Sequence, residues 1–177
     1  MRNLLNRIRE PMKSSVWKTA LFCVIFLIIG GISGAVSKLA DVYSEILGNY
    51  TSGICMWILI GTVICVFAKS PFRAAAYVFL LCAGMIAAYY VTAEIGDLYY
   101  STSFVKGWSI FTLFTPIFAL IAWYSRGRKW QSWVIRIGIA VVMLGGLLLI
   151  SGNVFLDALS IVGAIVVTMI KPEPRED

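Results

Sequence analysis

The sequence has no histidine and few charged residues, and both shortages limit its chemistry. None of its 177 residues is histidine, and only 14% are Asp, Glu, Lys or Arg. Without histidine the chain lacks the commonest proton shuttle and transition-metal ligand, and the usual base of a Ser-His or Cys-His catalytic pair. The sequence therefore predicts no catalytic centre, metal site or cofactor. A membrane enzyme is the least favoured interpretation, with Glu94 and Asp157 as its best acid or base candidates.

Cysteine is also scarce, and its spacing argues against redox chemistry. The four cysteines all lie inside apolar runs, and no C-x-x-C pair occurs. A thioredoxin-type or quinone-coupled site is therefore not expected. We expect four buried thiols that behave as small hydrophobic side chains. They are Cys23, Cys55, Cys65 and Cys82.

Apolar residues are abundant instead. They make up 60% of the chain, whereas a soluble domain has about 45–50%. This composition excludes an ordinary water-soluble globule, and it excludes disorder, which needs low hydrophobicity. The predicted fold class is all-α: a polytopic membrane protein built as a bundle of six transmembrane helices, with no room for a soluble domain.

Six apolar runs define one membrane domain with two short flanks. Residues 1–16 form a basic amphipathic segment, residues 17–170 the six-helix domain, and residues 171–177 a charged tail. Apolar side chains at helical spacing predict a short amphipathic helix at the outer interface over residues 36–47. The last two spans form a hairpin, with a single reentrant unit as the alternative. The expected spans are 17–36, 53–68, 74–91, 108–124, 133–150 and 154–170.

The distribution of positive charge predicts the topology. With the N-terminus inside and six spans, 13 of the 15 Lys and Arg residues fall on the inner side and only Lys38 and Lys106 outside. This matches the positive-inside rule, and five or seven spans would break the alternation. Both termini are therefore expected in the cytoplasm. Because the net charge of +6 lies beside apolar spans, it predicts contacts with the bilayer and its anionic lipids rather than with nucleic acid.

Candidate binding residues gather near the outer ends of the spans. Glu94, Asp97 and Asp157 are acids on that side, as are Asp41 and Glu45 after the first span. A shallow acidic cavity there would suit a cationic or polyhydroxylated ligand; a solvated rim is the alternative. Aromatic side chains bracket the loop between the third and fourth spans and could stack on a ring-containing ligand. An interfacial aromatic belt is the simpler explanation. They are Tyr89, Tyr90, Tyr99, Tyr100 and Trp108.

Proline and small residues predict how the helices bend and pack. Pro116 must loosen the fourth span and free the carbonyl of Thr112. Either a threonine hydroxyl satisfies this carbonyl or it faces a cavity, so Thr112, Thr115 and Pro116 are candidates for ligand contact or for a structural kink. Small residues in the first, third and fifth spans favour close helix packing, with homodimerisation as the alternative. They are Gly30, Gly31, Gly34, Gly84, Ala87, Ala88, Gly138, Gly145 and Gly146.

Three short motifs in the central third of the chain match a known pattern. They are Lys69-Ser70-Pro71, Gly84-Met85 with Tyr89-Tyr90, and Thr115-Pro116 with Ala119, Trp123-Tyr124 and Gly127. In these the chain resembles a bacterial family of small polytopic membrane proteins of unknown function, frequent in Firmicutes. The resemblance implies a multi-pass protein of the bacterial cytoplasmic membrane and supplies no activity. In size and topology alone, the chain is similar to the substrate-binding subunits of energy-coupling-factor transporters.

Two functions fit these features about equally well. One is a small-molecule binding or transport component with a site open to the outer face. The other is a non-catalytic accessory protein that binds a membrane protein partner through its helix faces and basic inner loops. The sequence does not identify the ligand or the partner.

Overall fold

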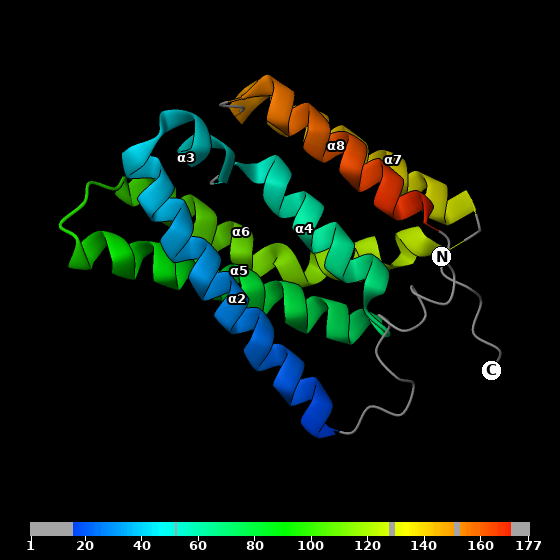
Figure 1. Ribbon diagram of the computed structural model, residues 1–177. Coiled ribbons are helices and arrows are strands. Elements are labelled where there is room, and N and C mark those ends of the chain that lie inside the picture. Colours follow the sequence, from blue (N-terminus) through cyan, green and yellow to red (C-terminus); the bar gives the residue numbers. More distant parts are fainter. Residues whose placement is uncertain (1–15, 52, 128–129, 151–152, 171–177) are drawn as a thin grey trace.

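The structure is a computed structural model that describes residues 16–51, 53–127, 130–150 and 153–170. These residues form helices and no strands (Figure 1), which confirms the all-α class. Most of the basic segment 1–16 and all of the tail 171–177 lie outside the described residues. The helices are α2 (Val16–Tyr43), α3 (Glu45–Thr51), α4 (Ile54–Phe67), α5 (Pro71–Ile95), α6 (Thr102–Trp123), the 3-10 turn η1 (Tyr124–Arg126), α7 (Trp130–Ile150) and α8 (Val154–Met169).

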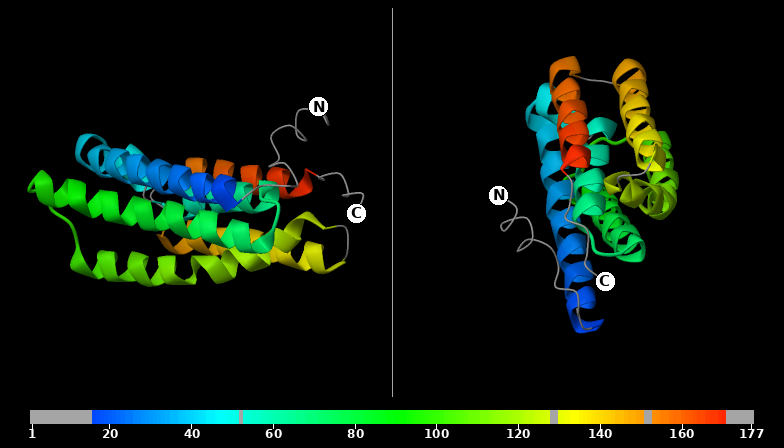
Figure 2. Two further views of the ribbon diagram at one scale, coloured as in Figure 1. Left: turned by 90° about the horizontal axis from the view of Figure 1, so that it is seen from below. Right: turned by 90° about the vertical axis from the view of Figure 1, so that its right-hand side faces the viewer.

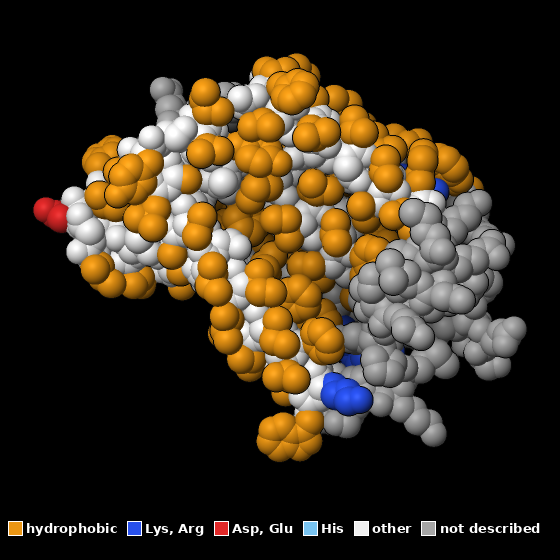
Figure 3. Space-filling view, in the orientation of Figure 1, with side chains coloured by type: hydrophobic (Ala, Val, Ile, Leu, Met, Phe, Trp, Pro, Cys, Tyr) orange, Lys and Arg blue, Asp and Glu red, His pale blue; other side chains and the backbone are white. Residues whose placement is uncertain are grey.

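Four of the described helices are long and apolar enough to cross a membrane: Trp17–Tyr43, Pro71–Ile95, Val105–Arg126 and Trp130–Leu148. Helices α4 and α8 are apolar but have only 14 and 16 residues. At 1.5 Å per residue they measure about 21 and 24 Å, against about 30 Å for a bilayer core. The outer surface of the bundle agrees with a lipid environment, because large hydrophobic side chains cover it (Figure 3).

The first helix differs from the prediction. A span over 17–36 followed by a separate amphipathic helix is wrong: α2 continues unbroken to Tyr43, and only the short α3 is separate. No proline or other strong helix breaker interrupts the sequence at Val36. The extra turns carry Lys38 and Asp41 to the end of the bundle, where they become part of a cavity.

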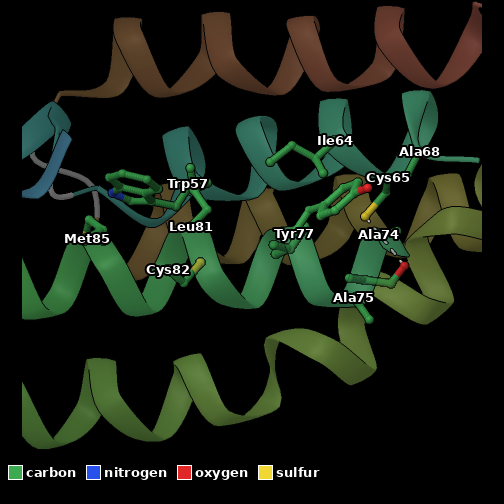
Figure 4. Packing of buried hydrophobic residues seen from close by; sticks show 12 residues of the cluster. Trp57, Ile64, Cys65, Ala68, Ala74, Ala75, Tyr77, Leu81, Cys82 and Met85 are labelled. Atoms are coloured by element: carbon green, nitrogen blue, oxygen red, sulfur yellow. Dashed lines mark hydrogen bonds between the residues drawn. The ribbon is translucent and has the colours of Figure 1, made fainter. Parts of the chain in front are cut away.

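The six longer helices pack side by side (Figures 1 and 2). Helix α5 lies between α2 and α6, and α4 occupies the centre, where it contacts α5, α6, α7 and α8. Buried side chains of α4 and α5 form the main core, with Tyr77 reaching from α5 toward α4 (Figure 4). Three of the four cysteines are buried in these helices, and Cys23 is half-buried. The expectation of buried thiols that act as small hydrophobic side chains is therefore confirmed for three of the four cysteines.

Glycines bring α2 and α5 into backbone contact. A Cβ atom at Gly30 would overlap the carbonyl oxygen of Leu81, and one at Gly34 would overlap that of Met85. From the other helix, a Cβ at Gly84 would overlap the carbonyl oxygen of Leu27. The prediction of close packing is therefore confirmed for the small residues of the first and third spans. In the fifth span it is wrong for Gly138 and Gly145, where a Cβ atom would meet nothing within 4 Å.

Basic side chains tie one end of the bundle together. We call this the arginine end and define it by Lys69, Arg73, Arg126 and Arg136. The carbonyl oxygen of Ala68 accepts hydrogen bonds from Trp123 Nε1 (3.0 Å) and from the Arg126 guanidinium (2.8 Å). Arg136 is buried and donates to the carbonyl oxygens of Ser125 (2.8 Å) and Gly127 (3.1 Å). The positive charges therefore also hold the connections between helices.

Candidate functional site

A cavity of about 420 Å³ opens at the end of the bundle opposite the arginine end. It lies where α2 and α5 end and the chain passes into α6 (Figure 1). We call it the tyrosine cavity. Its lining residues are Lys38, Asp41, Val42, Tyr89, Tyr90, Leu98, Tyr99, Tyr100 and Ser101.

Lys38 is the cation of the cavity. Its side chain is 4% exposed although the residue lies near the end of a long helix. The ammonium donates a hydrogen bond to the carbonyl oxygen of Tyr99 (2.8 Å) and lies 5.1 Å from the centre of the Tyr89 ring. A buried ammonium is costly unless it is compensated. Here a carbonyl dipole and an aromatic face supply the compensation.

Asp41 lies one helical turn beyond Lys38 and is the anion of the cavity. Its carboxylate accepts a hydrogen bond from the hydroxyl of Tyr89. Tyr89 thus faces the ammonium of Lys38 with its ring and binds the carboxylate with its hydroxyl. Within the described part of the chain neither Lys38 nor Asp41 forms an ion pair.

Tyrosines continue the wall of the cavity toward the solvent. The rings of Tyr89 and Tyr90 meet edge to face at 5.1 Å, and those of Tyr90 and Tyr100 lie 5.3 Å apart. The hydroxyl of Tyr100 donates a hydrogen bond to Glu94, which raises the pKa of this tyrosine. Glu94 is therefore connected to the cavity through Tyr100 rather than lining it.

Asp97 ends α5. Its φ of 48° is the only positive value outside glycine among the described residues. The amide of Leu98 donates to the carbonyl oxygen of Ala93 (2.8 Å), and the amide of Asp97 donates to that of Glu94 (3.3 Å). This is the Schellman arrangement, with an aspartate where glycine is commonest. It turns residues 98–101 over the cavity.

Pro116 and its threonines lie inside α6 and do not line the cavity. Proline cannot donate to the carbonyl oxygen of Thr112, so the hydroxyl of Thr115 donates to it instead (2.7 Å). Both threonines are buried. Of the two roles considered for this carbonyl, the structure shows the local repair. Trp108 packs against the core and meets Phe111 edge to face at 5.5 Å.

Asp157 belongs to a different polar cluster. It lies in the first turn of α8, where the helix dipole favours a carboxylate, and it is 4% exposed. Its side chain interacts with the thiol of Cys55, which also lies 3.4 Å from the carbonyl oxygen of Met143. Nearby, the hydroxyls of Ser160 and Tyr50 are 3.3 Å apart. The cluster joins α4, α7 and α8.

The structure thus brings together some of the predicted site residues and separates others. Tyr89 and Tyr90 line one cavity, Glu94 and Asp97 shape its rim, and Asp157 lies in another cluster. Asp41 was expected only as one of five acids on the outer side, and Lys38 was not expected in a cavity; both line the tyrosine cavity. Their three-residue spacing places both on one helix face, but only with α2 continuous does that face reach the tyrosines.

No group of three or more Cys, Asp or Glu side chains within the described ranges could hold a metal ion. Comparison with known proteins finds no family model, no curated protein and no solved structure that matches this chain. The interpretation of the site therefore depends on its own geometry.

Proposed function

We propose that the chain is a six-span protein of the bacterial cytoplasmic membrane with both termini in the cytoplasm, of the Firmicutes-type family that its central motifs resemble. The placement of charge supports this topology. Asp41, Glu94 and Asp97 lie toward one end of the bundle, where α2 and α5 end, and the arginine end lies at the other (Figure 1). Basic residues prefer the cytoplasmic side, where anionic lipids can also bind them. The shorter α4 and α8 complete their spans with interfacial side chains and local bilayer thinning.

Cysteine labelling in whole cells tests this topology. We expect Ser103→Cys to react with a membrane-impermeant maleimide in intact cells, and Gln131→Cys to react only after permeabilisation. Both positions are exposed, and the unsubstituted chain, with its own four cysteines, is the background control. Protease-sensitive tags at both ends should be protected in intact cells.

Each failure of this experiment has a distinct meaning. With the N-terminal tag inside, a chain in which α4 does not cross would place Ser103→Cys in the cytoplasm. A chain in which α8 does not cross would expose the C-terminal tag. Either result would contradict six spans and leave an integral membrane protein with fewer crossings.

We further propose that the protein is a small-molecule binding or transport component whose site is the tyrosine cavity at the outer face. The observation that carries this proposal is a buried lysine and an aspartate in one tyrosine-walled cavity, neither engaged in an ion pair within the described chain. Pockets for small ligands typically combine apolar and aromatic walls with a few polar groups, in about 300–1,000 Å³. Glu94 and Asp97 would act at the rim.

Native mass spectrometry of the protein, taken from its own membranes in mild detergent, tests this function. We expect a reproducible small-molecule adduct that Tyr90→Ala abolishes, because this side chain forms part of the cavity wall. Tyr43→Ala is the matched control: Tyr43 is 84% exposed at the same end of the molecule and does not line the cavity. An adduct that survives Tyr90→Ala would place the ligand elsewhere.

The alternative function is that of an accessory protein. The observation that favours it is the long α2, whose side chains from Trp17 to Ile29 remain largely exposed as an apolar face. A partner helix could cover this face in place of lipid. The same mass spectrum separates the two functions, because a stoichiometric protein partner without a small-molecule adduct would identify an accessory subunit.

A further inference from the structure

We propose that the ligand of the tyrosine cavity is a small zwitterion that carries one carboxylate and one cationic nitrogen, as amino acids and betaines do. This inference rests on the proposed binding function and narrows it to a chemical class. It differs from the cationic or polyhydroxylated ligand that the outer acids predict, because the structure adds a lysine to the site.

The carboxylate of such a ligand would bind Lys38. An ammonium group has three donor hydrogens, and in the structure one of them is used by the carbonyl oxygen of Tyr99. The side chain is buried, and among the described residues its ammonium contacts a carbonyl dipole and an aromatic face rather than a carboxylate. A carboxylate brings both an opposite charge and further acceptors, which is the strongest form of compensation for a buried cation.

The cationic nitrogen would bind Asp41 and the tyrosines. A carboxylate has about four acceptor sites, of which the Tyr89 hydroxyl uses one. The faces and edges of Tyr90 and Tyr100 line the same space, and aromatic faces attract ammonium groups, including fully methylated ones. Both polar ends of the ligand would therefore meet groups that form no ion pair with any other described residue.

The charges in the cavity favour a zwitterion over a ligand that carries only one charge. Lys38 and Asp41 give the lining one positive and one negative charge. An amine would satisfy Asp41 but would place a second cation beside buried Lys38. A simple carboxylate would satisfy Lys38 and repel Asp41. Only a ligand with both charges compensates both residues at once.

Thermal unfolding of the purified full chain in detergent, with added solutes, tests the inference. The probes are the twenty standard amino acids and glycine betaine, each added separately. For the probe that raises the midpoint most, the analogues that lack the carboxylate or the ammonium are then titrated. We expect each analogue to bind at least about 30-fold more weakly, the loss typical when one partner of a desolvated charge pair is removed.

Charge-removing variants assign the two ends of the ligand. Lys38→Gln keeps a donor for the Tyr99 carbonyl, and should bind the zwitterion and its decarboxylated analogue equally. Asp41→Asn keeps an acceptor for the Tyr89 hydroxyl. It should bind the zwitterion and the analogue that lacks the ammonium equally. Lys106→Gln is the control for removal of a positive charge, since Lys106 is exposed and does not line the cavity. The unliganded midpoint of each variant shows that it is folded.

Three results would overturn the inference. The first is that no zwitterion raises the thermal midpoint. The second is that the unsubstituted protein binds the zwitterion and its analogue without the carboxylate equally well. The third is that Lys38→Gln still prefers the zwitterion to this analogue. If an amine alone binds in the cavity, the zwitterion inference fails and the proposed binding function stands. If no probe binds and the native mass spectrum contains only a protein partner, both fail.

Discussion

Gly34→Ala is expected to lower the free energy of unfolding by about 2–3 kcal/mol, the cost of forcing extra atoms into a tightly packed contact. The added methyl group would overlap the carbonyl oxygen of Met85, which is backbone and cannot rotate away. Helices α2 and α5 would have to separate along their whole contact. For a chain of this length the thermal midpoint should fall by roughly 4–12 °C, which differential scanning fluorimetry in detergent would measure.

Gly31→Ala is the matched control for this prediction. Gly31 lies on the same helix only three residues away, but a Cβ there would meet the Ala88 methyl at 3.9 Å, an ordinary contact. The substitution should be neutral or stabilising by up to about 1 kcal/mol, because alanine favours helix more than glycine does. Equal destabilisation by both substitutions would contradict the close approach of the two backbones.

This contact also links the packing to the tyrosine cavity. Helix α2 contributes Lys38 and Asp41, and α5 contributes Tyr89 and Tyr90. The four side chains meet only because the glycines let α2 lie directly on α5. A variant that separates the helices should therefore weaken ligand binding as well as stability, although no glycine lies in the cavity lining.

Hydropathy predicted where the apolar helices lie better than where they end. The expected span over 74–91 corresponds to α5, which begins at Pro71 and ends at Ile95. Ser70 accepts a hydrogen bond from the amide of Arg73 and caps the helix, with proline in its first turn. Apolar content marks the part of a helix that suits lipid, whereas capping residues and chain reversals set its ends.

The candidate site was predictable only where its residues are neighbours in sequence. Tyr89 and Tyr90 follow an apolar run and precede a polar loop, so their place at the end of a span could be inferred. Lys38 lies about fifty residues earlier, and its contact with Tyr99 depends on how α2 packs. Composition places charges at an interface, but it does not show which of them a neighbouring helix will bury.

Arg136→Met is expected to lower the free energy of unfolding by about 3 kcal/mol. Two hydrogen bonds from a charged donor to backbone carbonyls would be lost, at roughly 1.5–3 kcal/mol each, partly offset by removal of a buried charge. The carbonyls of Ser125 and Gly127 would lose this donor at the turn that connects α6 to α7. Thermal unfolding in detergent measures the effect, and Lys106→Met on the exposed side of α6 should change little.

Arg136→Lys separates hydrogen bonding from net charge. Lysine keeps the positive charge at this position of α7, but it lacks the planar fork that reaches two carbonyls. It also loses much of the contact with the Trp133 ring, which lies 5.0 Å from the guanidinium. We expect this variant to keep its topology and to lose about half of the stability that the methionine variant loses. If lysine restored full stability, the role of the arginine would be charge alone. If methionine had no effect, the arginine end would not be held by these bonds.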